Sequence, residues 1–199
     1  MNCDRLNAFS DGVIAILITI LVLELKVPHG TDWSALKGLV PIFLTYVLSF
    51  VFLAIYWSNH HHMLQLTDTV TGGILWANTH LLFWLSLIPF VTAWMGENHF
   101  APLPTALYGV VMMFAGVAYF ILEQTIIRAQ GANSKLRAAV GSDTKGKISV
   151  VLYLSAIPLA FVHQLIADAI YVAVALMWLV PDRRIEDRIQ DGSAQAHSR

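Results

Sequence analysis

Long apolar runs constrain this chain more than any other feature of its sequence. A helix needs about 20 mainly apolar residues to cross a hydrocarbon core about 30 Å thick, and only helices and closed barrels satisfy the backbone there. Of the 199 residues, 57% are hydrophobic and 13% are charged, whereas soluble domains carry roughly 25% charged residues. The mean hydropathy is +0.64. These values predict an all-α, polytopic integral membrane protein.

The apolar runs predict six transmembrane helices within one domain, residues 1–189. The last run extends from Ile148 to Pro181, and as one helix it would be about 50 Å long, too long for a single span. We therefore expect the chain to turn at His163-Gln164. The predicted spans are residues 6–27, 38–57, 73–96, 105–127, 148–162 and 165–181, and residues 190–199 are expected to form a disordered cytoplasmic tail.

The distribution of basic residues predicts the orientation of these spans. Lysine and arginine concentrate in cytoplasmic segments, and here they gather in the linker after the fourth span and in the tail. Both segments lie on the same side only if an even number of spans separates them, which the turn at His163 provides. The amino and carboxyl termini are thus predicted to be cytoplasmic, which leaves only Lys26 and Lys37 on the outer side.

One face of the first span carries Ile16, Thr19, Ile20 and Leu23, which follow helical spacing. Any apolar helix contains such a stripe, so packing alone could explain it. The single hydroxyl midway along the stripe favours a functional interpretation. A ring of such helices would present apolar constrictions that gate ions by dewetting, with a ring of threonines between them.

A polar cluster of Arg5, Ser10 and Asp11 lies at the start of this span. Ionisable residues inside a membrane are costly unless they pair or serve transport. Ser10 and Asp11 could instead cap the helix, and Arg5 could be a simple cytoplasmic anchor. Alternatively, Arg5 could meet Asp11 through a neighbouring helix or subunit and fix how the first helices pack.

Histidines after the second span, and two polar residues in the third, are candidate partners of this polar cluster. Consecutive histidines on a helix point about 100° apart and chelate a metal poorly, so no metal site is predicted. We expect His60 and His61 to hydrogen-bond to the polar cluster. Asn78 and His80 could join the same network, although helix-to-helix hydrogen bonding would also account for them.

The sequence contains no glycine-rich phosphate loop, no nucleophile elbow and no Thr-Val-Gly-Tyr-Gly carbonyl filter. No enzyme activity, cofactor or nucleic-acid partner is therefore predicted. An alternative is a proton-coupled secondary transporter that uses Asp11, His80 and Asp168 as a relay, although snorkelling also explains Asp168. A third class is a structural membrane protein without a permeation path, which would carry no ion flux.

Several short motifs resemble those of the transmembrane protein 175 family, which comprises potassium channels of lysosomes and of bacterial plasma membranes. The first motif is Arg5-x-x-x-Phe9-Ser10-Asp11 at the start of the first span. The others follow in the same order in the next two spans, as Trp57-x-x-His60-His61, Leu75-Trp76-x-Asn78 and Leu87-Ile88-Pro89-Phe90-Val91-Thr92. The resemblance covers at least the first three spans.

The resemblance implies a homotetramer in a bacterial plasma membrane, whose first helices line a central pore without a carbonyl filter. The family's constriction corresponds to Ile16, Ile20 and Leu23, and its selectivity-associated threonine, which hydrogen-bonds to neighbouring helices, corresponds to Thr19. The implied activity is passive, potassium-preferring cation transport, with potassium ions, the lipid bilayer and other copies of this chain as partners. The implied structural network comprises Arg5, Ser10, Asp11, His60, His61, Asn78 and His80.

Overall fold

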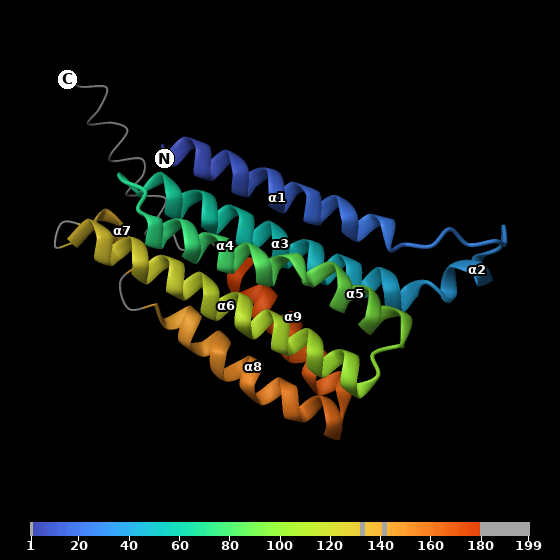
Figure 1. The fold of residues 1–199 in the computed structure, drawn as a ribbon. Helices are drawn as coiled ribbons and strands as arrows, with labels where there is room; N and C mark the ends of the chain where they lie inside the picture. Colours follow the sequence, from blue (N-terminus) through green and yellow to red (C-terminus); the bar gives the residue numbers. More distant parts are fainter. Residues whose placement is uncertain (1, 132–133, 141–142, 180–199) are drawn as a thin grey trace.

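Successive helices run back and forth between two ends of an elongated bundle in the computed structural model of the chain (Figure 1). The structure describes residues 2–131, 134–140 and 143–179, and within these ranges every regular element is a helix, as predicted. The elements are α1 (Cys3–Leu23), α2 (Trp33–Lys37), α3 (Val40–Gln65), α4 (Gly72–Ser86), α5 (Ile88–Glu97), α6 (Pro102–Gln130), α7 (Lys135–Val140), α8 (Thr144–Val162) and α9 (Gln164–Leu179).

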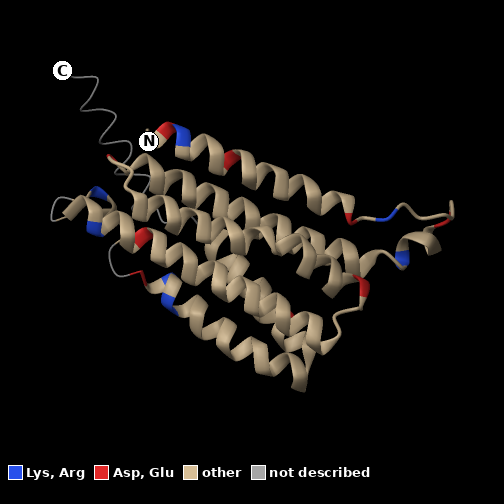
Figure 2. Cartoon of the chain, in the orientation of Figure 1, with Lys and Arg blue, Asp and Glu red and all other residues tan. Residues whose placement is uncertain are grey.

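The lengths and charges of these helices are those of a membrane protein. Five segments are long and apolar enough to cross a bilayer, namely α1, α3, α4 with α5, α6 and α8. The apolar helix α9 has 16 described residues, about 24 Å of helix. Most charged residues lie near the two ends of the bundle, and few lie between them (Figure 2). The predicted tail, residues 190–199, lies outside the described residues.

The predicted third span is not one continuous helix, because α4 ends at Ser86 and α5 begins at Ile88. Pro89 lies in the first turn of α5. Proline has no amide hydrogen with which to continue the ladder to the carbonyl of Leu85. The chain therefore breaks at Leu87 and resumes as α5 toward the same end of the bundle (Figure 1).

The ends of the first and second predicted spans are shifted in the structure, whereas the turn after the fifth span lies at the expected residue. The helix α1 ends at Leu23, four residues before the predicted end, and Val27 precedes Pro28, a position that disfavours helix. In contrast, α3 continues to Gln65, so the three histidines lie on the helix rather than after it. The chain turns back at His163, between α8 and α9, as predicted.

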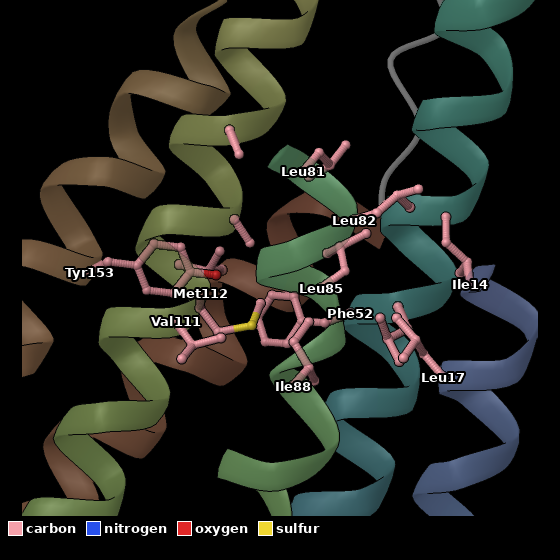
Figure 3. Packing of buried hydrophobic residues seen from close by; sticks show 14 of the residues in the cluster. Ile14, Leu17, Phe52, Leu81, Leu82, Leu85, Ile88, Val111, Met112 and Tyr153 are labelled. Atoms are coloured by element: carbon pink, nitrogen blue, oxygen red, sulfur yellow. The ribbon is translucent and has the colours of Figure 1, made fainter. Parts of the chain in front are cut away.

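The core of the bundle is a continuous apolar cluster to which α1 and each helix from α3 to α9 contribute. Ile14 and Leu17 of α1 approach Phe52 of α3 and the leucines of α4 (Figure 3). Lipid tails are as apolar as these side chains, so close van der Waals packing, rather than escape from water, holds such helices together. This packing holds one face of α1 against the other helices of the bundle.

Candidate pore helix and its polar network

The helix α1 has one buried face and one exposed face. Its buried residues are spaced three or four apart and pack against α3, α4 and α5. This spacing is that of a single helical stripe. The buried stripe consists of Leu6, Ser10, Ile14, Leu17 and Leu21.

The residues predicted to line a pore lie largely on the exposed face. Ile16 is 58% exposed and Leu23 is 78% exposed, Thr19 is also exposed, and Ile20 is half-buried. The Thr19 hydroxyl donates to the carbonyl of Ile16, at 2.8 Å, on its own helix. Within the described chain, it therefore lacks the bond to a neighbouring helix that the resemblance implies. This exposed face is available to lipid or to another copy of the chain.

A buried hydrogen-bond network joins α1, α3 and α4. The His60 Nε2 atom lies 2.7 Å from Asn78 Oδ1, and Asn78 Nδ2 donates to Ser10 Oγ at 3.0 Å. The Ser10 hydroxyl in turn donates to the carbonyl of Leu6 at 2.9 Å. Ser10, His60 and Asn78 are each at most 1% exposed, so water cannot replace a lost partner. The structure thus brings together three of the predicted network residues.

The direction of these bonds determines which ring nitrogen of His60 carries a hydrogen. Because Asn78 Oδ1 can only accept, His60 Nε2 carries the hydrogen. The other ring nitrogen, Nδ1, is buried and has no hydrogen-bond partner among the described residues. The imidazole therefore acts here as a single donor that ties α3 to α4.

Asp11 and His61 form a second contact between α1 and α3, nearer the surface. The Trp57 indole donates to Asp11 Oδ1 at 3.0 Å, and His61 Nδ1 lies 4.0 Å from Asp11 Oδ2. The Asn7 amide lies 3.3 Å from the same His61 nitrogen, and the rings of Trp57 and His61 are stacked. Among the described residues, no group of three or more histidine, cysteine or acidic side chains is placed to hold a metal ion.

Two predicted network members lie outside this network in the described chain. Arg5 is exposed and forms no ion pair with any described residue. His80 is exposed and accepts a 3.0 Å hydrogen bond from Trp84 on its own helix. Asp168 lies on α9 and is half-buried, with an unpartnered Oδ1 atom among the described residues. No described contact links Asp11, His80 and Asp168 into a relay.

The sequence reasoning missed another buried network, which joins α3, α5 and α6. Ser49 Oγ lies 2.6 Å from Thr92 Oγ1 and 3.1 Å from Tyr108 Oη. The Thr92 hydroxyl donates to the carbonyl of Ile88, so it accepts from Ser49, which accepts from Tyr108. The only signal in the sequence was the presence of isolated hydroxyl residues within otherwise apolar spans.

The chain is similar to known channels over most of its length. A family model described as endosomal/lysosomal potassium channel TMEM175 matches residues 5–89. A protein of Chryseobacterium sp. (strain P1-3), named a potassium channel, is 51% identical over 191 residues, 96% of this chain and 100% of that protein. A protein of Chamaesiphon minutus, also named a potassium channel, is 29% identical over 184 residues, 86% of this chain and 91% of that protein.

The fold is also similar to that of a solved channel. The crystal structure of a lysosomal potassium-selective channel TMEM175 homolog from Chamaesiphon minutus matches with a TM-score of 0.79 and 26% identity, covering 89% of this chain and 96% of that chain. These relatives are ion channels rather than enzymes, as predicted. The likeness extends well beyond the three spans that carry the sequence motifs, and the chain therefore belongs to the TMEM175 family of potassium channels.

Proposed function

We propose that this chain is one subunit of a potassium-preferring cation channel that conducts passively down the electrochemical gradient. The names of the two bacterial relatives support potassium as the permeant ion. In the proposed assembly, four copies place their α1 helices around a central axis. No cofactor takes part.

The observation that carries the proposal is the position of the predicted pore stripe on α1. Thr19 is the sole polar side chain between Gly12 and Leu23, and it is exposed on a face that turns away from its own bundle. Around a central axis, Ile16, Ile20 and Leu23 would form successive apolar rings with the threonine ring among them. Apolar constrictions of this kind gate by dewetting.

The proposed selectivity depends on the cost of removing water from the ion. A cation that passes apolar rings receives few replacement ligands, so it must keep part of its hydration shell. Potassium binds its hydration water less tightly than sodium does. Partial removal of that water on entry therefore costs potassium less free energy. Selectivity should therefore be weaker than in channels whose backbone carbonyls replace the hydration shell.

The proposed location is a bacterial plasma membrane, with six spans and both termini in the cytoplasm. The described basic residues support this orientation, since α7 and the start of α8, which carry several of them, lie at the same end of the bundle as the amino end of α1, which carries Arg5 (Figure 1). The segment after α1 and the helix α2, which carry Lys26 and Lys37, lie at the opposite end (Figure 1). The excess of positive charge thus falls on one side, as it does in cytoplasmic segments.

A flux assay on the purified protein in liposomes tests the proposal. We expect potassium efflux to exceed sodium efflux. A proton uncoupler should be needed only because potassium efflux builds up a voltage, which proton movement then dissipates. Flux driven by a proton gradient against the potassium gradient would instead support the transporter that uses Asp11, His80 and Asp168. The absence of any ion flux would support a structural protein and contradict the channel.

Substitution of Ile16 tests the position of the pore. Ile16→Asn should wet the constriction, raise single-channel conductance several-fold in a planar bilayer and reduce the preference for potassium over sodium. Ile148→Asn on α8 is the matched control, because Ile148 is also exposed, at 44%, but lies on a helix outside the proposed pore. Unchanged conductance in Ile16→Asn would contradict the assignment of α1 as the pore helix.

A further inference from the structure

A cavity of about 330 Å³ lies between α3, α6, α8 and α9, and no residue of α1 lines it. This volume falls within the range of about 300–1,000 Å³ that is typical of small-molecule sites. Three of the helices line it over similar lengths, from residue 52 to 59, from 113 to 120 and from 146 to 153. Each length is about two helical turns, so the cavity is about 10 Å deep.

The cavity is a built feature of the packing between α3 and α6. Gly116 lines it without a side chain, and a Cβ atom added there would meet only the Tyr56 hydroxyl, at 3.9 Å. Tyr56 packs edge-on against Tyr119, whose hydroxyl donates to the carbonyl of Asn59 at 3.3 Å. These two rings keep the helices apart at this level. The deeper lining is apolar and includes Phe52.

One end of the cavity is polar, and it lies at the end of the bundle that holds the amino terminus (Figure 1). Lys147 and Asp143 both line this mouth. The Asp143 carboxylate accepts from the Gly146 amide at 3.1 Å and caps α8. Burial raises the pKa of the Asp143 carboxyl, whereas the Gly146 amide and Lys147 act in the opposite direction. Lys145 is a second cation beside the cavity rather than in its lining, with its Nζ atom 5.9 Å from the centre of the Trp178 ring, which does line it.

We propose that this cavity holds one acyl chain of an anionic phospholipid from the surrounding bilayer. The apolar slot would bind the chain, and the basic mouth would contact the phosphate through Lys145 and Lys147. The basic residues of α7 and of the start of α8 lie at this end of the bundle (Figure 2), and anionic lipid surfaces attract such cations. The cavity is about 10 Å deep, whereas one leaflet of the hydrocarbon core is about 15 Å thick, so only part of one chain would enter it and the second chain would stay in the bilayer.

Native mass spectrometry of the purified, delipidated protein tests this site with palmitoyl-oleoyl phosphatidylglycerol as the probe. Val150→Phe fills the cavity from α8, and Gly116→Leu fills it from α6. The matched control is Val151→Phe, which makes the same change at the next residue, where the side chain is 62% exposed and outside the cavity. We expect one phosphatidylglycerol per subunit in the wild type and control, and at least tenfold weaker binding in both filled variants.

The head group and the source of the chain are tested in separate arms. Phosphatidylcholine should bind several-fold more weakly than phosphatidylglycerol, and Lys145→Gln with Lys147→Gln should abolish that difference. Val150→Phe and Gly116→Leu fill the cavity from different helices, α8 and α6. If one variant fails to fold, the other still tests the site. Equal binding by filled and wild-type proteins, equal binding of the two lipids, or binding of oleic acid in place of phosphatidylglycerol would overturn the proposal. This binding assay does not depend on ion conduction.

Discussion

Asn78 donates a 3.0 Å hydrogen bond to the Ser10 hydroxyl and so holds α1 against α4 inside the bundle. Ser10 and Thr19 are nine residues apart in the sequence, and each residue turns a helix by about 100°. Nine residues therefore place the two side chains on opposite faces of α1. The hydrogen bond that anchors Ser10 inward thus orients Thr19 outward, toward the proposed pore.

Removal of the Asn78 amide should destabilise the subunit. Asn78→Leu keeps a similar volume but leaves the His60 Nε2 hydrogen without its acceptor and Ser10 Oγ without its donor in a buried site, at a cost of about 1–3 kcal/mol. We expect a clear decrease in the melting temperature of the purified protein. The control is Thr79→Ala at the next position, since Thr79 is exposed and, among the described residues, its hydroxyl bonds only to the Leu75 carbonyl of its own helix. Equal melting temperatures in the two variants would contradict this role of Asn78.

Asp11 should act mainly through its hydrogen bond with Trp57 rather than through its charge. Asp11→Asn keeps an oxygen that can accept from the indole, whereas Asp11→Leu removes it. We expect the asparagine variant to melt close to the wild type and the leucine variant to lose about 1 kcal/mol of stability. Thermal unfolding of both proteins distinguishes these outcomes. If the two variants are equally damaged, the charge of Asp11 and its 4.0 Å approach to His61 matter more.

Two glycines should respond in opposite ways to the same substitution. A Cβ atom at Gly96 would lie 2.8 Å from the Cα atom of Ile42, where α5 crosses α3, whereas one at Gly12 would meet nothing within 4 Å. Gly96→Val should therefore cost about 1–3 kcal/mol through overpacking. Gly12→Val should leave the subunit stable but change potassium flux, because Gly12 is exposed on α1. Melting curves and liposome flux, measured on both variants, test this pair; unchanged flux in Gly12→Val would argue against contact between α1 helices.

The helical class and the membrane location followed from the sequence because span length and polarity are set by the bilayer. The turn at His163 could also be predicted, since 34 consecutive residues exceed a single span. In contrast, the break at Leu87 was missed because Pro89 lies within a mainly apolar run whose length, residues 73–96, is that of a single span. The continuation of α3 to Gln65 was missed because polar histidines suggested the end of a span, although nothing there breaks a helix.

The network was predicted in part because the sequence indicates residue types but not which faces meet. Ser10, His60 and Asn78 were expected at the same end of the bundle, and hydrogen bonds join them in the structure. On sequence alone, His80 was grouped with these residues. However, His80 lies two residues after Asn78 and therefore points about 200° away from it on α4. The Ser49, Thr92 and Tyr108 contact depends on the packing of α5 against α3 and α6, which no local pattern encodes.

Thr19 should influence selectivity more than stability. Its hydroxyl bonds only to the Ile16 carbonyl of its own helix among the described residues, and the side chain is exposed. Thr19→Val keeps the shape but removes the only hydroxyl of the stripe, so it should lower the ratio of potassium to sodium permeability by several-fold with little change in melting temperature. Thr19→Ser retains the hydroxyl and should preserve most of the ratio. Reversal potentials measured under bi-ionic conditions test both variants, and an unchanged ratio in Thr19→Val would place selectivity on the isoleucine and leucine rings alone.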